Sequence, residues 1–164
     1  MLSNLPFIHE SVVHMLADAA ARAGDAVALI DGEQRLNYRE FARCVGGFAA
    51  ELKSLGTVGD RVALICGNSI DIAIAMFAVH AAGMQVVPIN PIYTERELSH
   101  ILSDSDPVAV IFDDEIADCV GSVASKLSMT NLIPIGGTGG RSLTTGKDDT
   151  AADFPQPLPA PDDF

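Results

Sequence analysis

The fold is decided by residues 81–106, AAGMQVVPINPIYTERELSHILSDSD. This stretch runs from the end of an apolar helix through a short apolar strand into a second helix. Thr94 and Glu97 have the spacing of a capping box, in which each side chain bonds the backbone N–H of the other residue. Tyr93 and Leu98 occupy the positions of a hydrophobic staple around the same helix start. The stretch therefore predicts a helix–strand–helix unit, the building block of an α/β fold.

The region before it begins with a predicted hairpin and a second capped helix. Ala26–Ile30 and Gln34–Leu36 flank an Asp-Gly pair, which accepts the positive φ of a tight turn and predicts a short N-terminal β-hairpin. Asn37 and Glu40 then repeat the capping-box spacing. The helix that they begin is predicted to end at Gly56.

Short apolar runs alternate with helical patterns along the rest of the chain. The runs predict buried strands at Arg61–Cys66, Gln85–Ile89, Val108–Phe112 and Leu132–Ile135. Further helices are predicted over Ser11–Arg22, over Ile70–Ala82, which is apolar on nearly every side and should be buried, and over 116–127. Strands alternating with helices through short loops predict a mostly parallel sheet with helices on both faces.

Composition divides the chain near residue 135. With 164 residues, the chain is long enough for one α/β domain or subdomain. Five of the nine prolines and five of the fourteen glycines lie between Pro134 and Phe164. We therefore predict an α/β subdomain at 1–135 and a Gly/Pro/Asp-rich linker at 136–164.

The charge and the cysteines limit the class of protein. A net charge of −12 disfavours nucleic acid and anionic lipid as partners. Cys44, Cys66 and Cys119 are odd in number and lie in apolar runs, which is typical of buried thiols in a reducing compartment. The first ten residues lack a secretory signal pattern, and the longest apolar stretch, Ile72–Met84, is shorter than the ~20 residues that span a bilayer. A cytoplasmic protein without a transmembrane segment is expected.

Three stretches, in the same order, resemble core motifs of the adenylate-forming enzymes, the superfamily of acyl-CoA synthetases and AMP ligases. They are LNYREF (36–41), GDRVALICGNSIDIAIAMFAVHAAG (59–83) and VVPINPIYTERELSHILSDSDPVAVIFDD (86–114). The resemblance extends from Asp25 to about Leu132. The Asn-Pro pair and the Tyr-Thr-x-x-Glu-Leu helix start are more similar to acid–CoA ligases than to peptide-synthetase adenylation domains.

The resemblance implies an ATP-dependent ligase that uses Mg²⁺ and coenzyme A. A carboxylate would attack the α-phosphate of ATP to give an acyl-adenylate, and the thiol of coenzyme A would then displace AMP. The acid is a fatty, aryl or other organic acid, and the sequence does not say which. A fatty acyl-AMP ligase or a peptide-synthetase adenylation domain is an alternative. A non-catalytic α/β module that binds a partner or regulates a ligase is another.

The family's phosphate loop, adenine segment, ribose aspartate and catalytic lysine have no counterpart in this chain. No catalytic residue and no metal ligand is therefore predicted, and the chain is interpreted as the N-terminal subdomain of a longer enzyme that alone neither binds ATP tightly nor turns over. The ending PAPDDF (159–164) resembles the approach to the phosphate loop. SLTTGKDD (142–149) is rejected as that loop, because Leu143 replaces a glycine and two aspartates would face the phosphates.

Asn90, Pro91 and Tyr93 are the candidate cofactor-binding residues. They follow the end of a predicted strand, where open α/β sheets usually bind ligands, and the resemblance implies that the path of coenzyme A is near. Turn geometry at Asn90-Pro91 and staple packing of Tyr93 are the alternative explanations. His80 is interpreted as a core residue, and His100 as part of a solvated helix face.

The isolated chain is expected to self-associate into a homo-oligomer, because apolar elements that normally pack against the missing parts would be exposed.

Overall fold

The computed structural model describes residues 8–149, 154 and 157–160. The helices are α1 (Val12–Ala23), α2 (Tyr38–Leu52), α3 (Ile70–Ala81), α4 (Glu95–Ser105) and α5 (Ala117–Leu127). The strands are β1 (Val27–Asp31), β2 (Gln34–Asn37), β3 (Arg61–Ile65), β4 (Gln85–Pro88), β5 (Ala109–Asp113) and β6 (Leu132–Ile135). Two short 3₁₀ helices, η1 (Asp114–Ile116) and η2 (Leu143–Asp148), complete the order.

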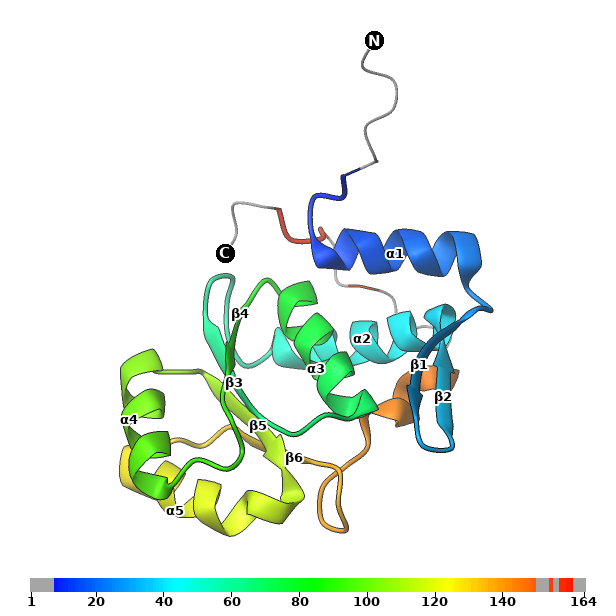
Figure 1. The fold of residues 1–164 in the computed structure, drawn as a ribbon. Coiled ribbons are helices and arrows are strands. Elements are labelled where there is room, and N and C mark those ends of the chain that lie inside the picture. The colour runs from blue at the N-terminus through cyan, green and yellow to red at the C-terminus, as the bar shows by residue number, and fades with distance from the viewer. Residues whose placement is uncertain (1–7, 150–153, 155–156, 161–164) are drawn as a thin grey trace.

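The central sheet has the strand order β4-β3-β5-β6, and every neighbouring pair is parallel. The strands β1 and β2 form a separate antiparallel hairpin, in which Gly32 has φ +57°. The predicted parallel sheet and N-terminal hairpin are therefore confirmed (Figure 1).

Both faces of the sheet are covered, and β3 shows how its sequence permits this. Val62 and Leu64 belong to the core cluster that also contains buried residues of α1, α2 and α3. Ala63 and Ile65 belong to the cluster formed with α4 and α5. Successive strand residues point to opposite faces, so a strand buried on both sides must be apolar throughout. Figure 1 shows the two groups of helices on opposite sides of the sheet.

The predicted helix starts have the expected hydrogen bonds. Glu40 N donates to Asn37 Oδ1 at 2.8 Å, and Asn37 N donates to Glu40 Oε2 at 2.9 Å. Thr94 and Glu97 form the same reciprocal pair at the start of α4. These bonds satisfy backbone donors that have no partner within the helix.

Removing the Asn37 cap should destabilise the chain measurably. Asn37→Ala deletes the acceptor for Glu40 N, and we expect the free energy of unfolding to fall by about 1 kcal/mol. Urea unfolding followed by far-UV circular dichroism measures the loss. Asn37→Asp keeps a capping oxygen and serves as the control. Equal losses in the two variants would contradict a role for the cap.

Two details differ from the sequence prediction. Helix α2 ends at Leu52 rather than at Gly56, because the N–H groups of Ser54 and Leu55 donate to carbonyls three residues back, which tightens the chain into turns. Helix α3 is buried on most sides but not all, since Met76 is 37% exposed. The sequence of α3 is apolar on nearly every side and predicted that the whole helix is buried. That prediction was wrong at Met76.

The segment after β6 is packed over part of its length. Arg141 forms a bridge with Ile135, Leu143 is only 6% exposed, and residues 143–148 fold as η2. The glycine and proline content predicts a linker here, but composition alone cannot show that Leu143 is buried and fixes the segment to the core. The domain boundary at 135 stays a prediction, and the PAPDDF resemblance rests mostly on residues 161–164, which lie outside the described part.

Candidate functional site

The loops that follow β3, β5 and β6 meet at the carboxyl edge of the sheet. They enclose an open cavity of about 300 Å³ there. Its lining consists of Gly67, Asn68, Ser69, Asp71, Asp113, Glu115, Ile135, Gly136 and Gly137. Open parallel sheets usually bind ligands at this edge, so the cavity is a candidate ligand site.

Carboxylates hold the backbone at this edge. Asp113 Oδ2 accepts from Gly67 N at 2.7 Å. Asp114 Oδ2 accepts from Gly139 N at 2.8 Å. Asp71 Oδ1 accepts from Leu143 N at 2.7 Å. Three backbone N–H groups of the kind that bind phosphate therefore already have carboxylate acceptors. The same carboxylates make this edge of the sheet negatively charged. These residues do not fit the phosphates of ATP by themselves.

The two buried thiols near these elements are unreactive. Burial, followed by the negative charge of Asp113, raises the pKa of Cys66 to about 12. Burial also raises the pKa of Cys44 to about 11. Since the thiolate is the nucleophile, both side chains are apolar packing groups at neutral pH.

The segment SLTTGKDD has the contacts of a packed turn. Ser142 Oγ caps η2 by accepting from Thr144 N at 3.3 Å. Leu143 is buried, and its N–H is bonded to Asp71. The structure therefore agrees with rejecting this segment as a phosphate loop, because its first amide donors already have protein acceptors.

Asn90, Pro91 and Tyr93 lie together in one turn after β4. Asn90 Oδ1 accepts from Ile92 N at 3.1 Å, and Tyr93 N donates to the Asn90 carbonyl at 3.2 Å. The Asn90 side chain is thus used by the turn itself. Tyr93 is 39% exposed. The turn geometry accounts for Asn90, whereas the Tyr93 side chain remains accessible to a ligand.

A shallow open hollow of about 640 Å³ adjoins this turn on α4. It is lined by Thr94, Arg96, Glu97 and His100. Arg96 is the cation in this lining. The sequence analysis did not identify it, because a single arginine on an exposed helix face belongs to no recognisable motif.

The described residues contain no group of three His, Cys, Asp or Glu side chains placed to hold a metal ion. His80 is half-buried in α3, and burial lowers its pKa. Within the same described part, no helix is long and apolar enough to cross a membrane.

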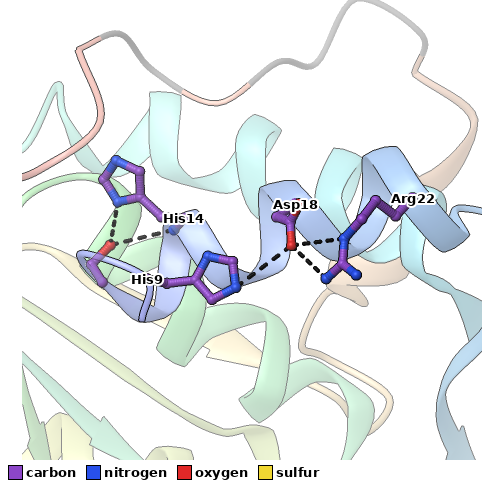
Figure 2. A network of polar contacts seen from close by, with 5 residues as sticks. His9, His14, Asp18 and Arg22 are labelled. Carbon is purple, nitrogen blue, oxygen red and sulfur yellow. Dashed lines mark hydrogen bonds and ion pairs between the residues drawn. The ribbon is translucent and has the colours of Figure 1, made fainter. Parts of the chain in front are cut away.

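A polar network runs along α1 (Figure 2). Ser11 Oγ caps the helix and lies 2.8 Å from His14 Nδ1. Asp18 accepts from Arg22 Nε at 2.9 Å, and this bond lowers the pKa of Asp18. His9 Nε2 lies 3.5 Å from the same carboxylate. The network ties the chain before α1 to the helix, away from the loops that line the carboxyl-edge cavity.

Comparison with known proteins decides the family, since residues 16–164 match the AMP-binding enzyme family. This chain belongs to the AMP-binding enzymes. It is 38% identical over 130 residues to a long-chain-fatty-acid–CoA ligase of Yersinia pestis, covering 78% of this chain and 23% of the relative. It is 37% identical over 113 residues to a medium/long-chain-fatty-acid–CoA/3-oxocholest-4-en-26-oate–CoA ligase of Mycobacterium marinum, covering 66% and 20%. The chain thus spans between a fifth and a quarter of the length of these relatives.

Solved structures agree with this AMP-binding assignment. The inhibitor-bound N-terminal domain of FACL13 from Mycobacterium tuberculosis superposes with a TM-score of 0.76 at 27% identity, covering 90% of this chain and 37% of that one. ATP-bound MatB from Rhodopseudomonas palustris gives 0.74 at 25% identity, covering 92% and 30%. The resemblance and the fold predicted from sequence are confirmed. The relatives quoted above are named as CoA ligases, and not as acyl-AMP ligases, peptide-synthetase domains or non-catalytic modules.

Proposed function

We propose that this AMP-binding chain is the N-terminal scaffold of an ATP-dependent fatty acid–CoA ligase. The single observation that carries the proposal is the 38% identity to a long-chain-fatty-acid–CoA ligase over 78% of the chain. Strands β3 and β5, most of β4 and both capping boxes lie within the motifs that resemble the family, so the similarity extends to elements that build the core.

The proposed reaction joins a long-chain fatty acid to coenzyme A. The carboxylate attacks the α-phosphorus of ATP and pyrophosphate leaves, after which the thiol of coenzyme A displaces AMP from the acyl-adenylate. Mg²⁺ would supply charge neutralisation at the phosphates. Because the carboxyl edge of this chain is acidic and three of its amide donors are occupied by carboxylates, the phosphate and metal ligands are proposed to come from the rest of the enzyme. The chain alone should bind ATP weakly.

Within this chain, Asn90, Pro91 and Tyr93 are proposed to lie along the path of coenzyme A. Their turn is at the carboxyl end of β4, Tyr93 is exposed, and the adjoining hollow contains the cation Arg96. An arginine suits the phosphates of a coenzyme. Self-association of the isolated chain and a cytoplasmic location stay predictions.

A segment exchange tests the proposed function. The matched segment of the Yersinia pestis ligase is replaced by residues of this chain, and thioester formation from ATP, coenzyme A and a long-chain fatty acid is measured. We expect an active chimera, because an equivalent scaffold is restored, and no ATP–pyrophosphate exchange by this chain alone. A folded chimera that forms no thioester would overturn the proposal, as would ATP–pyrophosphate exchange catalysed by the isolated chain. Circular dichroism of the chimera provides the folding control.

A further inference from the structure

Residues 141–149, called the strap here, lie across α2 after leaving the sheet. Leu143 is buried against the core, and Arg43 Nη1 on α2 donates to the carbonyl of Lys147 at 3.3 Å. We propose that Asp71 and the pair Glu51–Arg141 are positioning residues, which clamp the strap and fix the path along which the chain continues toward the rest of the ligase. This inference rests on the proposed function for its catalytic consequence, but the clamp itself can be tested on this chain.

The first clamp fixes the beginning of the strap to α2. Arg141 Nη1 and Nη2 donate to the two carboxylate oxygens of Glu51 at 2.9 and 2.8 Å. The same guanidinium lies 5.0 Å from the centre of the Phe48 ring. The Arg141 carbonyl accepts from Gly136 N, and Arg141 N donates to the Pro134 carbonyl. Both side chains of this ion pair are 45% exposed, so the pair alone is weak. Its bidentate geometry, the Phe48 ring and the backbone bonds together restrict the orientation of Arg141.

The second clamp fixes the strap to the first turn of α3. Asp71 Oδ1 accepts from Leu143 N at 2.7 Å and from Ser142 Oγ at 3.2 Å. The two clamps grip adjacent residues of the strap from two different helices. The strap therefore cannot pivot about either contact while the other is intact.

Two described residues beyond η2 lie on the same core. Phe154 and Leu158 are partly buried against the cluster that contains α1, α2 and α3. Clamps on the strap and packed residues beyond it favour a directed connection over a free tether. In the proposed ligase, this connection would set where the following segment meets the nucleotide.

Cys44 provides a built-in reporter of strap opening. Its side chain is 2% exposed and lines a cavity of about 140 Å³ together with Arg141, Leu143 and Gly146 of the strap. A Cβ added at Gly146 would lie 3.4 Å from Cys44 Cα, so the strap passes directly over this cysteine. Lifting the strap exposes the Cys44 thiol, whereas Cys66 is covered by other elements and is bonded to the Ile111 carbonyl.

The first experiment measures alkylation of Cys44 by N-ethylmaleimide on the full chain, resolved by peptide mass spectrometry. Asp71→Ala removes the acceptor of Leu143 N. We expect Cys44 to react about tenfold faster or more, because a hydrogen bond to a charged group is lost and local opening increases. The charge of Asp71 also raises the pKa of Cys44, so the rates are compared per thiolate, from the pH dependence of alkylation in each variant. Asp118→Ala is the matched control, since Asp118 holds the same second helical position in α5. Cys66 reactivity should stay unchanged in both variants.

Equal Cys44 rates in the Asp71→Ala and Asp118→Ala variants would overturn the clamp, as would a parallel rise of Cys66. A charge exchange tests the other clamp independently. Glu51→Arg should accelerate Cys44 alkylation, and adding Arg141→Glu should restore protection. Failure of the second substitution to restore it would show that this ion pair does not hold the strap.

The positioning role is measured in the segment-exchange ligase. Asp71→Ala should raise the KM for ATP about tenfold and change the KM for coenzyme A less than about twofold, because the error in placement affects the nucleotide first. Unchanged ATP kinetics together with faster Cys44 alkylation would overturn positioning and leave only a local clamp. An inactive parent chimera would instead count against the ligase proposal, while the Cys44 result on the chain would stand.

Discussion

Ile74→Ala is expected to lower the free energy of unfolding of this chain by about 3 kcal/mol, within the range for deleting a buried isoleucine side chain. Ile74 lies in the middle of α3 and is 0% exposed. It belongs to the cluster that joins α1, α2 and α3 to the sheet. Removing three carbon atoms there loses the transfer free energy and leaves a cavity that close-packed neighbours fill only in part.

Ile92→Ala makes the same chemical change at a site that is 81% exposed. We expect its effect to stay within about 0.5 kcal/mol, because no buried contact is lost. Urea unfolding followed by far-UV circular dichroism compares the two variants, since the chain has no tryptophan. Similar losses at both positions would mean that α3 does not pack as described.

Gly140→Ala is expected to distort the loop between β6 and the strap and to lower the free energy of unfolding by about 1–3 kcal/mol. A Cβ at Gly140 would lie 2.3 Å from the Gly136 carbonyl oxygen and 2.6 Å from the Ile135 carbonyl carbon. Both obstacles are backbone atoms, so no side-chain rotation relieves the clash. The loop must shift, and Arg141 shifts with it.

Gly121→Ala is the matched substitution, and it is expected to change the free energy of unfolding in the opposite direction. Gly121 lies inside α5, and nothing is within 4 Å of the position that its Cβ would occupy. Alanine should therefore stabilise the chain by about 0.5–1 kcal/mol through its helix propensity. Thermal and urea unfolding of both variants measure the difference. A neutral Gly140→Ala variant would show that the loop tolerates another path.

The candidate site was partly visible in the sequence. Asn90, Pro91 and Tyr93 follow an apolar strand, and the structure brings them together in one turn. The carboxylates of Asp71 and Asp113 were missed as a group. Asp71 lies in the first turn of a predicted helix and Asp113 directly follows a predicted strand, but no spacing rule connects a helix start with the end of a later strand. Their common role of holding loop amides at one edge is visible only in the fold.

Local interactions explain why the sequence by itself determined the elements of this protein. Asn37 and Glu40, and likewise Thr94 and Glu97, form hydrogen bonds three positions apart in the sequence. A short run of consecutive apolar residues likewise indicates a strand that is covered on both faces. Tertiary structure decided the strand order, the open face of α3 and the strap. Arg141 meets Glu51 across 90 positions, and Leu143 meets Asp71 across 72. Contacts at such separations depend on how the sheet and helices pack together. The glycine and proline content after β6 therefore does not reveal that Glu51 and Asp71 contact the strap.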